Sequence, residues 1–175
     1  MYNVTLPKMK RLLVIILTIL ACQLAEAQLA KFQALYIFNF ARNTSWPQED
    51  NGKEFTITVV GDNAVASALR AVVKNKKVGD RLVTINETSS ASGLPKSDIV
   101  YLGESKASRI GQLVASQAGN KVLIISGTSG QCSQGAGIAF APDGGKLSFE
   151  IHEANIAKHG LKVTPKVAQL GRQVN

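Results

Sequence analysis

Cys132, His152 and His159 are the side chains of this sequence best suited to nucleophilic or metal-dependent chemistry. Cys132 with His152 as a base would be the pairing that thiol enzymes use, and this pair stays open, although nothing beside either residue favours it. The two histidines are seven residues apart, whereas a zinc-protease helix places them four apart with a glutamate between them. No G-x-S-x-G elbow is present. We therefore interpret the histidines as surface residues and predict no catalytic residue and no metal ligand.

Glycines cluster between residues 127 and 137, after an apolar run. A phosphate-binding loop would carry lysine and then serine or threonine after its second glycine, but Ala136 follows Gly135. A dinucleotide-binding fingerprint would need a third glycine and a helix after Gly137, where the sequence favours a strand. We therefore predict no cofactor and expect a flexible loop before a hairpin, with a lid or contact loop as the alternative.

The segment 61–63 joins a predicted strand to a predicted helix, a place where parallel sheets bind anions. Asp62 is a good N-cap, and its carboxylate would occupy the free backbone donors of that helix and repel an anion. We expect Asp62 to cap the helix rather than to leave an anion site.

Aromatic residues gather near the start of the predicted domain, in a chain in which they make up only 6% of the residues. Phe32, Tyr36 and Phe40 recur at four-residue spacing, so we expect them on the buried face of a helix. The other two aromatics of this segment fall off that face, and aromatic side chains are favoured anchors at protein interfaces. We predict an exposed partner-binding patch made of Phe38, Trp46 and Pro47.

Periodicity and turn signals give the elements that position these residues. A helix over 29–42 ends before Trp46, which the following proline holds in an extended conformation. A Ser-rich loop covers 87–95. Further elements alternate along the chain, with strands at 55–60, 82–85, 99–102 and 122–125 and with helices at 64–74 and after Gly103.

The end of the chain has a different pattern. Strands at 138–141 and 146–151 flank the turn at 142–145, which predicts an antiparallel hairpin. A helix over 153–159 ends at Gly160, and a last helix over 163–174 begins near Thr164 and Pro165. Because strands that alternate with helices pair in parallel, we predict a single α/β domain. Its mostly parallel central sheet is flanked by helices and has a C-terminal antiparallel hairpin.

The first 27 residues have the order of a secretory signal peptide. Three basic residues between positions 8 and 11 precede an apolar run at 12–20, and Ala25 and Ala27 suit a signal peptidase. The run is shorter than the roughly 20 residues of a membrane-spanning helix. We predict cleavage between Ala27 and Gln28 and an exported domain at 28–175. The alternatives are a buried N-terminal helix, a lipid anchor at Cys22 and a start at Met9.

Removal of this signal takes away three cations and one anion, so the formal net charge falls from +8 to +6. Cys132 becomes the single remaining cysteine, and no intramolecular disulfide can form. We predict no nucleic-acid partner, because an exported protein rarely meets nucleic acid. We interpret the one basic cluster as a solvated helix end, with an anionic partner or membrane surface as the alternative. The cluster consists of Arg70, Lys74, Lys76, Lys77 and Arg81.

Several motifs of the chain together resemble the YfiR-like family. In family order they are Tyr36–Ala41 with Trp46–Pro47, Val59–Asp62, Asp98–Gly103, Lys146–Ile151 and Gly160–Thr164. They span almost all of residues 28–175. Two features depart from the family pattern. Known members carry disulfides, whereas Cys132 has no partner, and His152 stands where the family usually has asparagine.

The resemblance implies a non-catalytic regulator in the periplasm. The best-known member represses a membrane-bound diguanylate cyclase by binding its sensor region, and an outer-membrane lipoprotein sequesters that member. We therefore expect this chain to bind the periplasmic part of a diguanylate cyclase or sensor kinase and to modulate its output. A lipoprotein partner and a homodimer stay open. The alternative is a periplasmic small-ligand-binding domain, and a third reading is a Cys132-dependent enzyme.

Overall fold

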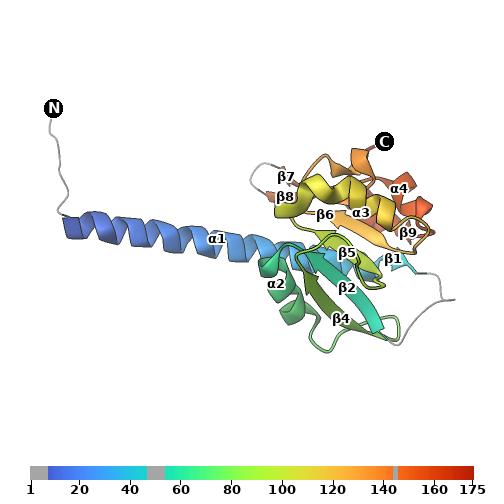
Figure 1. The fold of residues 1–175 in the computed structure, drawn as a ribbon, viewed down its shortest axis with the longest axis horizontal. Coiled ribbons are helices and arrows are strands. Elements are labelled where there is room, and N and C mark those ends of the chain that lie inside the picture. Colours follow the sequence, from blue (N-terminus) through green and yellow to red (C-terminus); the bar gives the residue numbers. More distant parts are fainter. Residues whose placement is uncertain (1–7, 47–53, 144–145) are drawn as a thin grey trace.

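An eight-stranded sheet forms the centre of the molecule in the computed structural model, which describes residues 8–46, 54–143 and 146–175 (Figure 1). The strand order is β10-β8-β7-β6-β5-β2-β4-β3. These strands are β2 (Glu54–Val60), β3 (Lys77–Val78), β4 (Arg81–Thr88), β5 (Ile99–Leu102), β6 (Leu123–Ser126), β7 (Ile138–Asp143), β8 (Lys146–Ile151) and β10 (Arg172–Gln173). Two short strands, β1 (Thr44–Ser45) and β9 (Lys162–Val163), form a separate antiparallel pair.

Helices connect most of these strands. They are α1 (Lys8–Arg42), α2 (Asn63–Val73), α3 (Ile110–Ser116), α4 (Glu153–Lys158) and α5 (Pro165–Leu170), with short 3-10 helices at Glu104–Arg109 and Gln131–Gln134. The run from β4 through β2, β5 and β6 to β7 is parallel, because crossovers rather than tight turns join these strands. The pair β7–β8 is antiparallel, as the hairpin signal predicts. The predicted fold class, a single α/β domain with a mostly parallel sheet, is confirmed.

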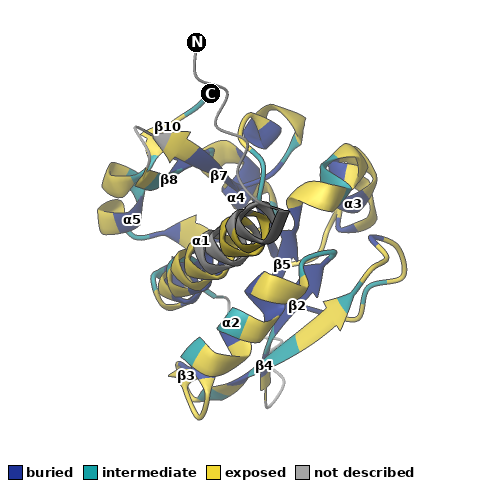
Figure 2. Cartoon of the chain, turned by 90° about the vertical axis from the view of Figure 1, so that its left-hand side faces the viewer, coloured by how far each residue is buried: buried dark blue, intermediate teal, exposed yellow. Residues whose placement is uncertain are grey.

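The sheet has an apolar cluster on each face. Ile99 and Tyr101 of β5 lie in one cluster, and Val100 and Leu102 lie in the other, because neighbouring side chains of a strand point to opposite faces. Figure 2 shows α1 and α2 on one face of the sheet and α3 on the other. The α1 face carries the larger cluster, and most aromatic side chains of the core lie in it.

Small residues let α1 lie close to the domain. Ala30, Ala34 and Ala41 are buried on one side of the helix together with Ile37. They recur at the three- and four-residue spacing of one helical face. Every described side chain of α1 before Ala30 is exposed, and Figure 1 shows this part of the helix running out from the domain. The predicted helix at 29–42 is therefore the packed part of a longer one.

Two predicted elements differ in the structure. The strand predicted at 82–85 is β4, which pairs with β2 as far as Thr88 and so takes up the start of the predicted loop. The last helix, predicted to reach residue 174, ends at Leu170. Gly171 is extended there, and a Cβ at this position would come within 2.5 Å of the Phe149 ring. The chain then continues as β10 along β8.

Candidate functional site

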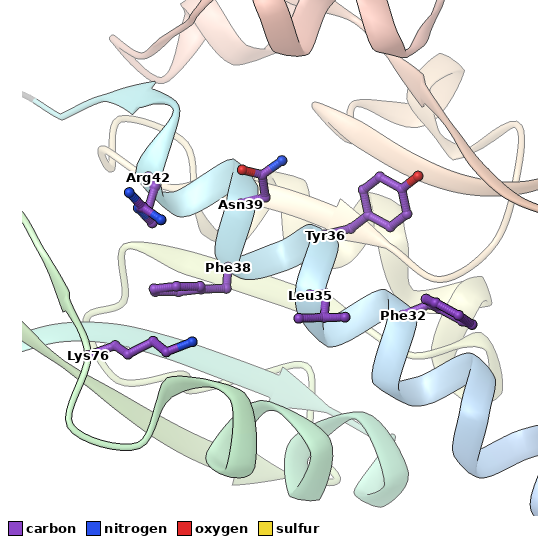
Figure 3. Close-up of a pocket in the computed structure, with 7 residues that line it drawn as sticks. All are labelled: Phe32, Leu35, Tyr36, Phe38, Asn39, Arg42 and Lys76. Carbon is purple, nitrogen blue, oxygen red and sulfur yellow. The ribbon is translucent and has the colours of Figure 1, made fainter.

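A hollow lies on the exposed side of α1, and we call it the α1 groove (Figure 3). Its volume is about 490 Å³. Lys76, in the turn after α2, lies opposite α1, so the groove is formed by two segments that are distant in sequence. The lining residues are Phe32, Leu35, Tyr36, Phe38, Asn39, Arg42 and Lys76.

Three aromatics of α1 do not share one environment, contrary to the prediction that all three are core. Phe32 is 48% exposed, Tyr36 is half-buried and Phe40 is 1% exposed. A four-residue step along an α-helix overshoots one turn by about 40°, so residues at this spacing drift around the helix. The buried face is centred on the alanines, and Phe40 therefore reaches the core while Phe32 reaches the groove.

Phe40 and Tyr36 anchor α1 to the sheet through other aromatic rings. The Phe40 ring lies 4.8 Å from that of Phe149 in an edge-to-face arrangement, and Tyr36 makes edge contacts with Phe140 and Phe149. Such geometry is favourable for aromatic pairs. These contacts fix the rotation of α1 and thereby the direction in which its open face points.

Phe38 is 8% exposed, so the prediction that it is an exposed aromatic is wrong. Two cationic side chains cover its ring: the Lys76 Nζ lies 5.0 Å from the ring centroid, and the Arg42 Cζ lies 5.9 Å from it. The apolar stems of lysine and arginine cover apolar surface while their charges stay in water. Phe38 is thus buried partly by two exposed, long side chains, which Figure 3 shows on either side of it.

Trp46 holds the C-terminal end of α1. Its indole Nε1 donates a hydrogen bond of 2.8 Å to the Ala41 carbonyl, and its ring lies 4.9 Å from that of Phe55, edge to face. A carbonyl in the last turn of a helix lacks an intrahelical donor, and the indole provides one. Trp46 is half-buried, and Pro47 lies outside the described residues. Trp46 therefore stabilises the end of α1 and is not among the residues that line the α1 groove.

The carboxylate of Asp62 is fully used inside the domain. One oxygen accepts the Val65 N–H at 3.0 Å, which confirms the predicted N-cap of α2. The other oxygen accepts the Tyr101 hydroxyl at 3.2 Å. Burial and the neighbouring Asp62 carboxylate raise the pKa of Tyr101 far above its ordinary value, so the phenol stays protonated and donates. At this strand-to-helix junction Asp62 therefore caps α2, as expected, and its carboxylate takes the place that an anion would need.

Hydrogen bonds hold the glycine-rich loop in place, which differs from the flexible loop that we expected. The Gly130 N–H, on left-handed backbone, donates to the buried carboxylate of Glu150, which also pairs with Arg172. The Asn155 amide donates to the carbonyls of Cys132 and Ala136, at 2.8 and 3.0 Å. Sequence reasoning missed Asn155 and Glu150, because isolated polar residues give no periodic signal.

Cys132 and the histidines have structural surroundings. Burial, followed by the Glu150 charge, raises the pKa of Cys132 to about 12, which is opposite to what a nucleophilic thiolate needs. His152 is the N-cap of α4, where its Nδ1 accepts the Asn155 N–H at 3.3 Å. The Nδ1 of His159 lies 2.8 Å from the Asn120 carbonyl.

The described residues form neither a cluster suited to a metal ion nor a helix suited to cross a membrane. No three His, Cys, Asp or Glu side chains among them come together where they could hold a metal ion. None of the helices in the described ranges is both long and apolar enough to cross a membrane.

The elements define a single α/β domain with a mostly parallel sheet and a groove along the exposed side of α1. A family model described as YfiR/HmsC-like matches residues 30–172. Since this match covers most of the chain, the protein belongs to the YfiR/HmsC-like family, and the resemblance seen in its motifs is confirmed. This is a family of periplasmic regulators associated with cyclic-di-GMP signalling.

Proposed function

We propose that this protein is an exported, non-catalytic regulator that binds the periplasmic part of a membrane signalling protein and modulates its output. The signalling protein is a diguanylate cyclase or a sensor kinase. Membership of the YfiR/HmsC-like family is the observation that carries this proposal. The buried thiol of Cys132 and the structural positions of His152 and His159 also support a role in binding rather than in catalysis.

Export as a cleaved protein is part of this proposal. The described side chains before Ala30 are all exposed, and the family match begins at residue 30. Cleavage between Ala27 and Gln28 would therefore leave the packed part of α1 intact. N-terminal sequencing of the protein recovered from the periplasm should give Gln28 as the first residue. An uncleaved chain, or one that begins at a lipid-modified Cys22, would contradict this.

Regulation is tested in cells and then with purified proteins. Deletion of the gene should change the cellular level of cyclic-di-GMP, or the output of a sensor kinase encoded nearby. The mature protein should bind the periplasmic region of that signalling protein in a pull-down. An unchanged output together with no association would refute the proposal. An outer-membrane lipoprotein is a second proposed partner, and the same pull-down with that protein tests it.

We propose a small-ligand sensor as the second candidate, because the volume of the α1 groove falls in the range of ligand pockets, roughly 300–1,000 Å³. A thermal-shift screen of periplasmic metabolites separates the candidates. A ligand at 100 times its dissociation constant should add about 2.7 kcal/mol to the free energy of unfolding. A screen without any stabilising compound would count against this candidate and leave the first one intact.

A further inference from the structure

The open face of α1 exposes apolar side chains on successive turns. Leu29, Phe32 and Leu35 are 47%, 48% and 44% exposed, although large apolar residues are mostly buried in a domain of this size. They follow one another along the same helix, and two of them line the α1 groove. A contiguous apolar surface with a polar rim is characteristic of protein interaction sites.

The rim of the groove is positively charged. Arg42 and Lys76 are exposed, and both lie against the ring of Phe38. None of the ion pairs formed within the described residues includes either cation. The groove thus combines apolar walls with two cations that no carboxylate of the described residues pairs with.

A second copy of this chain is a poor occupant, because its own groove would bring two more cations against Arg42 and Lys76. Like charges placed together across an interface cost several kcal/mol. An anionic membrane surface is also less favoured, since lipid recognition uses clusters of about four to eight free cations. Two members of the nearby basic cluster, Arg70 and Arg81, already pair with Glu87 and Asp98.

We infer that the α1 groove receives an acidic amphipathic helix from the signalling partner, an inference that rests on the proposed function. One apolar side chain of that helix packs between Phe32 and Leu35, as in other helix-in-groove complexes. A carboxylate on the same helix pairs with Arg42 and Lys76 and draws them from the ring of Phe38. The Phe38 ring then forms the floor of the filled groove. Arg42 and Lys76 cover this ring in the free protein, and the partner helix covers it in the complex.

Charge reversal in the groove tests the ionic half of this inference. The affinity of the mature protein for the periplasmic region of its signalling partner is measured by calorimetry at low and high salt. Arg42→Glu with Lys76→Glu should weaken binding at least about 10-fold at low salt, and by less at high salt, because salt screens exposed charges. The control is Arg109→Glu with Lys121→Glu, which makes the same change of charge at exposed residues beside α3. It should alter affinity less than about 3-fold.

The apolar half is tested by Phe32→Ala, which should weaken binding about 10-fold or more at both salt concentrations. Arg42→Lys with Lys76→Arg keeps the charges and should keep most of the affinity. Circular dichroism and thermal unfolding establish that each variant is folded. The sharpest test is a partner in which the matching acidic residue becomes lysine, since this change should restore binding to the charge-reversed protein.

The outcomes distinguish this inference from the function on which it rests. If the unmodified protein does not bind the signalling partner, the proposed function fails. If it binds but the groove variants behave like the control pair, the function stands and this groove is not the site. A dimer of the mature protein that Phe32→Ala converts to a monomer would identify a second copy as the occupant. Binding to anionic vesicles that only the groove reversal abolishes, with partner binding unchanged, would identify a membrane instead.

Discussion

The two faces of the sheet are both covered by apolar clusters, whereas only one face of α1 is buried. One face buries Ala34, Ile37 and Phe40 against the domain, and the other leaves Phe32 and Leu35 about half exposed. Both faces are apolar, so composition alone does not distinguish them. The difference lies in coverage. The buried face includes three alanines, which allow close approach to the domain, whereas Phe32 and Leu35 on the open face are large side chains that stay partly uncovered.

One helix thus has a face that packs in the core and a second face that we propose for recognition. The aromatic contacts of Phe40 with Phe140 and Phe149 set the rotation of the helix, and that rotation presents Phe32 and Leu35 to the outside. Changes on the buried face should therefore lower stability. Changes on the open face should alter binding while stability stays nearly the same. The following substitutions test this division.

Phe40→Ala should have the largest effect on stability. The ring is 1% exposed and lies among aromatic rings of β7 and β8, so its removal leaves a cavity. We expect the free energy of unfolding to fall by about 3–5 kcal/mol in urea denaturation. Phe40→Leu, which refills most of the volume, should lose much less. A loss below about 1 kcal/mol would show that the core does not depend on α1.

Ala34→Leu tests close approach on the same face. Ala34 is fully buried, and a larger side chain would push α1 away from the domain. Overpacking of this kind should lower the free energy of unfolding by about 1–3 kcal/mol. Lys31→Leu is the control, because it also adds an apolar side chain to α1 but at an exposed position. Equal stability of the two variants would contradict the assignment of the buried face.

Trp46→Phe tests a residue for which structure and sequence suggest different roles. The change removes the 2.8 Å hydrogen bond to the Ala41 carbonyl but keeps an aromatic ring against Phe55. We expect a loss of about 1 kcal/mol of stability. Partner binding should change little. If stability is unchanged and binding falls, Trp46 belongs to the binding surface, as the sequence alone suggests.

Phe32→Ala should have the smallest effect on stability. The side chain is half exposed, and alanine is the better helix former, so the change in the free energy of unfolding should stay within about 0.5 kcal/mol. Thermal and urea unfolding measure it beside the binding experiment. A loss comparable with that of Phe40→Ala would mean that the open face is also part of the core.

Much of the fold could be predicted because its signals are local. Asp62 lies where a strand meets a helix, and short side chains with an acceptor oxygen favour N-caps, so both the cap and the start of α2 are correct. The unbroken apolar run before Ser126 indicates a strand covered on both faces, and β6 is such a strand. The hairpin of β7 and β8 follows from the turn residues between them.

The site was less predictable, because it depends on packing between distant segments. Four-residue spacing placed Phe32 and Phe40 in one group, but the packing of alanines decides which of them is buried. The sequence does not show that Phe38 is buried, because one of the side chains over its ring is Lys76, which is remote in sequence. The last helix was extended too far for a similar reason. A Cβ at Gly171 would meet the Phe149 ring, and a contact between such distant segments leaves no periodic pattern in the sequence.

The turn after α2 has a consequence for how such proteins diverge. The helix ends at Val73, and Asn75 adopts left-handed backbone (φ 57°), after which Lys76 lies beside Phe38. Asparagine is among the few residues that tolerate this conformation. The wall of the groove that α1 forms belongs to a helix packed in the core. The opposite wall consists of one exposed residue, Lys76. If the α1 groove binds the partner as we propose, mutation at residue 76 would change the preferred partner while the fold stays the same.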